Sequence, residues 1–173
     1  VKPVTNGTLL KKYAGELIET GIDAIHVSVD GDKEAHNFVR QADWAYDKML
    51  EGLEAIIVER QRRNRHTPLV HVSFTMTRHN KSLSVYKLCE ELAGKGLLDV
   101  LCIKSNPIWV SASNGEAYNK IVAEYFGING LTSWTGFVED YRDFEEEAKE
   151  IAQTIRQLKT KDYDFFVHHL PSI

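Results

Sequence analysis

The stretch IHVSVDG (Ile25–Gly31) decides the fold, because apolar and polar residues alternate along it. The apolar residues are Ile25, Val27 and Val29, and the polar residues are His26, Ser28 and Asp30. Successive side chains of a strand point to opposite faces, so the alternation predicts a strand with one apolar and one polar face. The same alternation recurs in LVHVSFTMT (Leu69–Thr77), and VLCIK (Val100–Lys104) predicts a third strand.

Helical segments separate these strands. Apolar residues recur at helical spacing over five ranges: Thr8–Thr20, Asp32–Val58 with a break near Gln41–Asp43, Leu83–Gly94, Ala117–Phe126 and Phe144–Leu158. A last strand is predicted over Asp164–His169. Strands that alternate with helices form parallel βαβ units, and right-handed crossovers leave either a doubly wound sheet or a barrel.

The polar strand faces favour the barrel. Helices cover both faces of a doubly wound sheet, so its strands are apolar on both sides. The strands of this chain have one apolar face for the helices and one polar face, which suits an open or partial barrel with a ligand-holding interior. Antiparallel strands with one face in solvent are the alternative. The 173 residues are expected to form one α/β domain.

The composition is that of a globular protein, with 43% apolar and 27% charged residues and a net charge of −4. No broad basic face indicates nucleic-acid binding, and the basic run Arg60–Arg65 is expected at a helix end. Two cysteines, Cys89 and Cys102, form no disulfide framework, so we expect buried thiols and a cytoplasmic location. No apolar run is long enough to predict a membrane span. Because the chain opens on Val1 directly before a predicted strand, we expect a fragment of a longer protein.

Polar residues gather where the predicted strands end, which is where ligands bind in folds built from (β/α) units. The candidates are Thr5, Asn6, Ser28, Asp30, Thr75, Asn80, Lys104 and Asn106. Asp30 has the chemistry to accept hydrogen bonds from a ribose diol, and Arg40 to bind a carboxylate with two parallel bonds. Ordinary turn chemistry at Asn6–Gly7 and Asp30–Gly31, and a solvated Arg40, are the alternatives.

Four motifs taken together resemble the radical S-adenosylmethionine superfamily. They are TNGT (Thr5–Thr8), VSVDG (Val27–Gly31), EAHNFVR (Glu34–Arg40) and HVSFTMTRHN (His71–Asn80). The resemblance runs from about residue 3 to 106, and residues 107–173 are less typical of it. It implies a fragment of a partial (β/α)6 TIM-like barrel with parallel strands and outer helices, in which the motifs occupy the third to fifth strands.

The resemblance also implies a cofactor site. Ser28 and Arg40 would hold the ribose or aminocarboxylate end of S-adenosylmethionine, with Thr5 and Asn6 beside the cofactor. The remaining residues that it implies are Asp30, Thr75, Asn80 and Asn106. The complete enzyme would use S-adenosylmethionine, a [4Fe–4S] cluster and an external electron donor such as flavodoxin or ferredoxin. It would generate a 5′-deoxyadenosyl radical that removes hydrogen from a small-molecule, peptide or protein substrate.

The sequence departs from the superfamily at the cluster. Three thiolates in a C-x3-C-x2-C motif would bind it, and neither this motif nor the family's Gly-Gly-Glu segment is present. We therefore expect no metal ligands in this chain, which alone would be inactive, and expect the ligands to lie upstream of it. The pair His168–His169 lacks the further ligands that a metal site needs.

Two other functions stay open. Lys104, at the end of a predicted barrel strand, has the chemistry for a Schiff-base amine in a lyase or aldolase. A degenerate barrel kept as a binding or scaffold domain would also lack the cysteines. The sequence does not identify a substrate.

Overall fold

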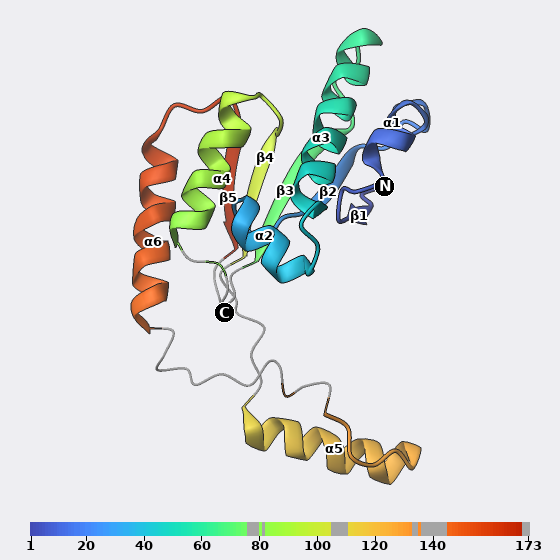
Figure 1. Cartoon of the computed structure of the whole chain (residues 1–173), viewed down its shortest axis with the longest axis vertical. Coiled ribbons are helices and arrows are strands. Elements are labelled where there is room, and N and C mark those ends of the chain that lie inside the picture. Colours follow the sequence, from blue (N-terminus) through green and yellow to red (C-terminus); the bar gives the residue numbers. More distant parts are fainter. Residues whose placement is uncertain (76–79, 81, 105–110, 133–134, 136–144, 171–173) are drawn as a thin grey trace.

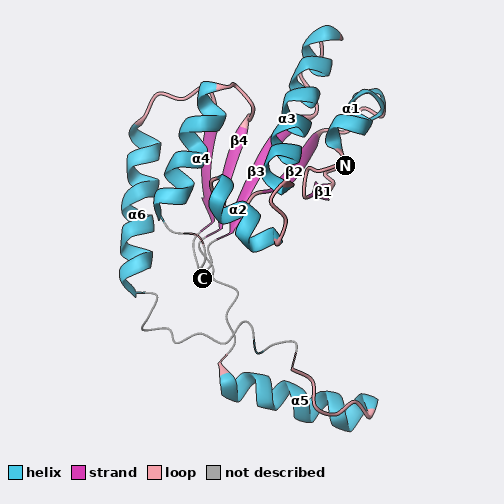
Figure 2. Ribbon diagram, in the orientation of Figure 1, coloured by secondary structure: helices cyan, strands magenta, loops and turns pink. Residues whose placement is uncertain are grey.

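The computed structural model describes the chain except residues 76–79, 81, 105–110, 133–134, 136–144 and 171–173. Figures 1 and 2 show strands and helices alternating along most of it. The strands are β1 (Val4–Thr5), β2 (Ala24–Ser28), β3 (Leu69–Thr75), β4 (Val100–Lys104) and β5 (Phe166–Leu170). The helices are α1 (Leu10–Glu19), α2 (Lys33–Arg40), α3 (Ala45–Arg62), α4 (Ser82–Gly94), α5 (Ala112–Phe126) and α6 (Glu145–Thr160).

The five strands form one sheet in the order β1-β2-β3-β4-β5, and every neighbouring pair is parallel. A doubly wound sheet reverses its strand order at a switch point, whereas this sheet follows the chain without reversal. The structure therefore confirms an α/β fold with parallel strands and helices between them, consistent with a fragment of a partial barrel. The antiparallel alternative is wrong for these strands.

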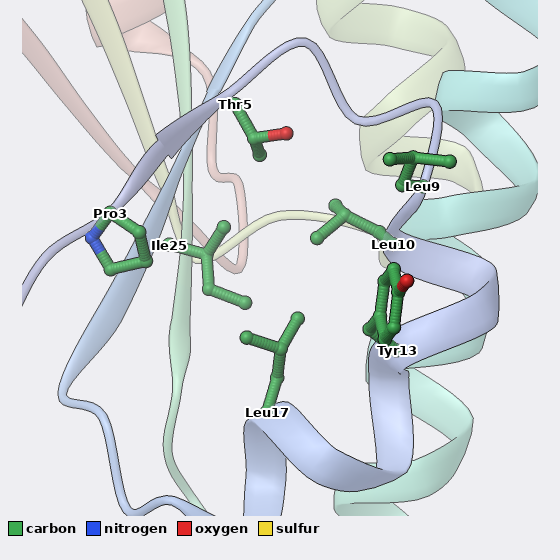
Figure 3. Close-up of a pocket in the computed structure, with 7 residues that line it drawn as sticks. All are labelled: Pro3, Thr5, Leu9, Leu10, Tyr13, Leu17 and Ile25. Carbon is green, nitrogen blue, oxygen red and sulfur yellow. The ribbon is translucent and has the colours of Figure 1, made fainter.

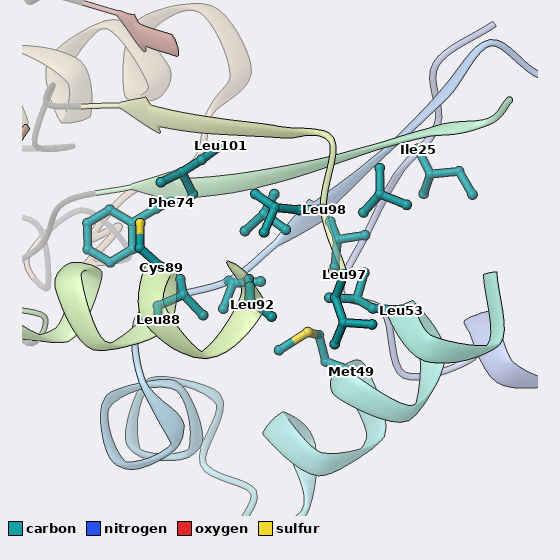
Figure 4. Packing of buried hydrophobic residues seen from close by; sticks show 14 of the residues in the cluster. Ile25, Met49, Leu53, Phe74, Leu88, Cys89, Leu92, Leu97, Leu98 and Leu101 are labelled. Carbon is teal, nitrogen blue, oxygen red and sulfur yellow. The ribbon is translucent and has the colours of Figure 1, made fainter. Parts of the chain in front are cut away.

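One face of the sheet is buried beneath helices. Val27, Val72, Leu101 and Val167 share one row across β2 to β5, and all four are buried. Figure 4 shows side chains of α3 and α4 packing among those of the sheet, including Met49, Leu53, Leu88 and Leu92. This apolar layer is the core, and burial of its large side chains is worth roughly 1.5–3 kcal/mol each.

The break between α2 and α3 falls where the sequence predicts it. Gln41 adopts a left-handed conformation with φ of 53°, which ends α2. Asn37 then bridges the turn: its side-chain amide donates to the Asp43 carbonyl at 2.7 Å, and its oxygen accepts from the Tyr46 amide at 2.9 Å. At the other end of α2, Asp32 caps the helix by accepting from the Ala35 amide. The short helix α2 is thereby held at the carboxyl end of β2 (Figure 1).

The basic run lies at the end of α3, as predicted, but one of its arginines binds residues just before β3 and β4. Arg60 donates from Nη1 and Nη2 to the two carboxylate oxygens of Asp99 at 2.6 and 3.1 Å, and to the Pro68 carbonyl at 3.1 Å. Asp99 also accepts from the Val70 amide at 2.7 Å. This Arg60–Asp99 clasp joins α3 to the amino ends of β3 and β4.

No helix in the described ranges has the length and apolar character that a membrane crossing requires.

Candidate functional site

The candidate site centres on Asp30, which lies just beyond the carboxyl end of β2. Its Oδ2 accepts from Nε of Arg40 at 2.7 Å and lies 3.2 Å from Nδ1 of His36. Both partners come from α2, which follows directly in sequence. Gly31 lets the backbone after Asp30 pass close to Ala35 and Ser84. Its φ is 137°, and a Cβ there would lie 3.0 Å from the side chains of both residues.

The Asp30 carboxyl is held in its charged form. Its side chain is only 15% exposed, and this burial favours the neutral acid and raises the pKa. Hydrogen bonding with His36 and the positive charge of Arg40 act in the opposite direction, and the pKa of Asp30 is lowered overall. Asp30 is therefore an anchor for Arg40 at the strand end.

Arg40 keeps one edge of its guanidinium available. The Asp30 bond uses Nε, and within the described ranges neither Nη atom has a hydrogen-bond partner. The side chain is one-third exposed. A guanidinium binds a carboxylate through two parallel N–H donors, so the Nη edge has the geometry for a second, external anion.

The face of the sheet away from the core carries polar side chains in register. Ser28, Ser73 and Cys102 share one row across β2, β3 and β4. Ser73 is only 6% exposed, and in the described part of the chain its Oγ has no hydrogen-bond partner. One row nearer the amino ends of the strands, the ring centroids of His26 and His71 are 4.6 Å apart. An unpartnered buried hydroxyl is costly unless a ligand or water completes it, so this row suits a polar ligand.

The Thr5–Asn6–Gly7 turn lies beside the sheet. Thr5 shares a row with the buried Val27, so its side chain belongs to the face covered by helices. Figure 3 shows Thr5 at an apolar cavity of about 200 Å³ whose other lining residues are Pro3, Leu9, Leu10, Tyr13, Leu17 and Ile25. The Thr5 hydroxyl accepts from the Gly7 amide, and Asn6 accepts from the amide and hydroxyl of Thr8. In this structure both side chains serve the turn, and their cofactor roles stay predictions.

Thr75 and Asn80 lie together at the end of β3. The Asn80 side-chain amide donates to the Thr75 carbonyl at 2.8 Å, and Asn80 is buried. Lys104 is exposed at the end of β4, in register with Thr75. Asn106 lies outside the described residues. The structure thus brings Ser28, Asp30, Arg40, Thr75 and Asn80 to the carboxyl ends of β2 and β3, while Thr5 and Asn6 belong to the turn after β1.

The cysteines do not fit an iron–sulfur cluster. Cys89 is buried in the core between α4 and the sheet, and burial raises the pKa of its thiol to about 12 (Figure 4). Burial also raises the pKa of Cys102, which lies on the other face in β4. Cluster ligands are thiolates, and neither environment favours one. Over the ranges that the structure describes, no three metal-ligating side chains come together.

Two residues of this site were not assigned to it from the sequence. His36 falls within a recognised motif, but only the fold shows that its ring lies against Asp30. Ser73 belongs to the predicted polar face, but its burial without a partner depends on the neighbouring strands. The polar alternation of β2 and β3, continued across the sheet, was the signal available for Ser73.

Comparison with known proteins finds local similarity to two curated proteins, and no family model matches the chain. A segment of 58 residues is 40% identical to a probable GTP 3′,8-cyclase of Methanocella arvoryzae, covering 33% of this chain and 19% of that protein. A segment of 60 residues is 38% identical to a probable GTP 3′,8-cyclase of Methanopyrus kandleri, covering 34% of this chain and 20% of that protein. The matched segments thus span about a fifth of each relative.

Proposed function

We propose that this chain is part of a radical S-adenosylmethionine enzyme and supplies one side of its cofactor site. The four motifs from Thr5 to Asn80 support the superfamily, and so does the local similarity to GTP 3′,8-cyclases, which are enzymes of this superfamily. A matched segment of about a fifth of those relatives does not carry their substrate over to this chain.

The observation that carries the proposal is the Asp30–Arg40 pair at the carboxyl end of β2. Asp30 anchors Arg40 through Nε, and the Nη edge of the guanidinium remains for an anion. The aminocarboxylate end of S-adenosylmethionine offers a carboxylate that suits this edge. We propose that Arg40 binds that carboxylate and that Ser28 and Asn80 line the site near it.

The face of the sheet away from the core extends the proposed site toward the rest of the cofactor. The Ser73 hydroxyl is buried and unpartnered among the described residues, between Ser28 and Cys102. A bound ligand with hydrogen-bonding groups would complete it. Asp30 and Thr75 flank this row, and their roles toward a ribose, like those of Thr5, Asn6 and Asn106, remain part of the proposal.

The cofactors would supply the hard chemistry, and the chain's own residues bind and orient. In this superfamily S-adenosylmethionine and a reduced [4Fe–4S] cluster supply a radical that removes hydrogen from substrate. Since Cys89 and Cys102 do not suit the cluster, its ligands would come from residues outside this chain, and its electrons from a donor such as flavodoxin or ferredoxin. We propose that the chain by itself is inactive.

Binding of two nucleosides by the 173-residue chain tests the proposal. S-adenosylmethionine carries the aminocarboxylate end, whereas 5′-methylthioadenosine lacks it. Arg40→Gln should weaken S-adenosylmethionine binding about tenfold or more, because a charge-assisted hydrogen bond is lost, and leave 5′-methylthioadenosine binding unchanged. Isothermal titration calorimetry measures both, with Arg65→Gln as the matched exposed-arginine control. Equal weakening of both ligands, or none, would contradict the assignment.

The lyase alternative has less support. Schiff-base lysines are generally activated by a hydrophobic pocket or a neighbouring cation, whereas Lys104 is exposed. Borohydride trapping of a carbonyl substrate, lost in Lys104→Ala, would favour it. The scaffold alternative predicts that neither nucleoside binds.

A further inference from the structure

Nδ1 of His36 has two neighbours that make opposite demands. It lies 3.1 Å from the backbone amide of Asp30, which is a donor, and 3.2 Å from Oδ2 of the same residue, which is an acceptor. A ring nitrogen either accepts or donates, according to whether it carries the proton. One of these two contacts is therefore a hydrogen bond and the other is not.

The far side of the ring helps to decide between them. The His36 side chain is only 1% exposed, and Nε2 has no hydrogen-bond partner among the described residues. The ring of Tyr46 packs edge-on against the imidazole, with the two ring centroids 5.8 Å apart, and this contact holds the imidazole in place. If Nε2 carried the proton, a buried donor would stay unsatisfied, and the bare Nδ1 would face the Asp30 carboxylate. Both are unfavourable.

The opposite tautomer makes the buried Nε2 a bare acceptor instead of a donor and turns an N–H toward the carboxylate. A proton on Nδ1 is donated to the Asp30 carboxylate, and hydrogen bonds to a charged acceptor are roughly twice as strong as neutral ones. The cost is the neutral bond from the Asp30 amide, whose partly buried N–H no longer has Nδ1 as its acceptor; this neutral bond is the weaker of the two. In this state Oδ2 accepts from His36 on one side and from Arg40 on the other.

We propose that His36, in its Nδ1–H tautomer, is a positioning residue that fixes the Asp30 carboxylate and, through it, the guanidinium of Arg40. His36 itself does not reach the ligand. It orients the carboxylate so that Arg40 is held by Nε and turns its Nη edge outward. The effect of His36 on ligand binding rests on the proposed function, whereas its effect on Arg40 does not.

The tautomer is tested on the free chain. Long-range ¹H–¹⁵N correlation spectra distinguish the protonated from the bare ring nitrogen, with His36→Gln identifying the signals. The expected result is a protonated Nδ1 and a bare Nε2 in the neutral ring. A bare Nδ1 would overturn the proposal, because the Asp30 amide would then be the true partner.

The positioning role is tested by three variants at position 36. The side-chain amide of Asn reaches the place of Nδ1, the amide of Gln reaches that of Nε2, and Leu has no donor. The Arg40 Nε–H resonance should stay protected from exchange with solvent in His36→Asn and exchange at least several-fold faster in His36→Gln and His36→Leu. Thermal unfolding of each variant separates this from a general loss of structure. Equal protection in all three variants would overturn the role.

Ligand titration then connects the two proposals. His36→Leu should weaken S-adenosylmethionine binding several-fold, His36→Asn should restore most of it, and 5′-methylthioadenosine binding should not change. If wild-type chain binds neither nucleoside while the Arg40 resonance follows the variants as expected, the proposed function fails and the positioning role stands. If S-adenosylmethionine binds but all three variants bind it equally, the positioning role fails and the proposed function stands.

Discussion

Gly7 has a backbone that only glycine adopts readily, in a place where no side chain fits. Its φ is +84°, and a Cβ would lie 2.9 Å from Cγ of Met49 and 3.1 Å from Val27. Gly21 has a similar φ of +67° but no atom within 4 Å of the Cβ position. The two glycines therefore separate backbone strain from steric conflict.

We expect Gly7→Ala to lower the free energy of unfolding by about 2–4 kcal/mol, because left-handed strain and overpacking add. Gly21→Ala should cost about 1 kcal/mol, from strain alone. Urea unfolding followed by circular dichroism measures both. Equal losses would show that the contact with Met49 has no energetic weight.

The Arg60–Asp99 clasp gives a second prediction at this scale. Asp99→Ala would remove the carboxylate that binds both the Val70 amide and the Arg60 guanidinium, which is 14% exposed and would keep its bond to the Pro68 carbonyl. We expect a loss of about 1–3 kcal/mol in the free energy of unfolding, because partly buried groups lose their hydrogen bonds. Glu51→Ala, which removes exposed pairs with Lys11 and Lys48, is the control and should change stability little. A loss no larger than that of the control would contradict the prediction.

At the scale of elements, the connection between β2 and α2 makes stability depend on pH. The pKa of Asp30 is lowered in the folded chain, against an ordinary value of 3.8, because His36 and Arg40 outweigh the effect of burial. A lowered folded-state pKa stabilises the fold above the unfolded-state value, and this stability is lost as the pH falls through the folded-state value.

Asp30→Asn should therefore destabilise the chain near neutral pH, and its difference from wild type should shrink as the pH falls below about 3.8. Unfolding free energies at several pH values measure this difference. Asp43→Asn, at an exposed aspartate in the turn after α2, is the control. A difference that stays constant with pH would show that the loss of stability in Asp30→Asn does not come from the loss of the carboxylate charge.

The sequence predicts helices and strands well where apolar residues recur at a regular spacing. The alternation in Ile25–Gly31 predicted both faces of β2, and the break after α2 was placed correctly because Gln41–Asp43 interrupts the helical spacing. The start of α5 at Ala112 was missed: Ser111 caps it by accepting from the Asn114 amide, ahead of the apolar residues that marked the helix. The capping serine lies outside the range of helical spacing, so periodicity alone does not reveal where this helix begins.

Contacts between elements followed less well, because sequence spacing does not reveal which residues meet. Arg60 was expected to interact with the end of its own helix, yet its main partner is Asp99, which lies 39 residues further along the chain. Its motif predicts Thr5 beside the cofactor, and the register with Val27 adds that its side chain lies on the helix-covered face; its cofactor role stays a prediction. Register fixes such faces, and register is a property of the assembled sheet.

At the scale of the whole molecule, the parallel sheet separates two environments. Helices cover one face and bury Cys89 in an apolar core, whereas the polar row on the other face contains Cys102 next to Ser73. The two thiols thus lie on opposite faces of the sheet, and burial raises the pKa of each. A cluster needs several thiolates at one place, which this arrangement does not provide.

We therefore expect anaerobic reconstitution of the chain with iron and sulfide to leave no bound [4Fe–4S] cluster, by visible absorbance and by iron and sulfide analysis after desalting. A bacterial-type ferredoxin treated in parallel is the positive control. In native chain both cysteines should also react much more slowly with a thiol reagent than after denaturation, because each thiol is buried and protonated. Four irons per chain, lost in a Cys89→Ser and Cys102→Ser double variant, would contradict this prediction. The two thiols would then lie together and not on opposite faces of the sheet.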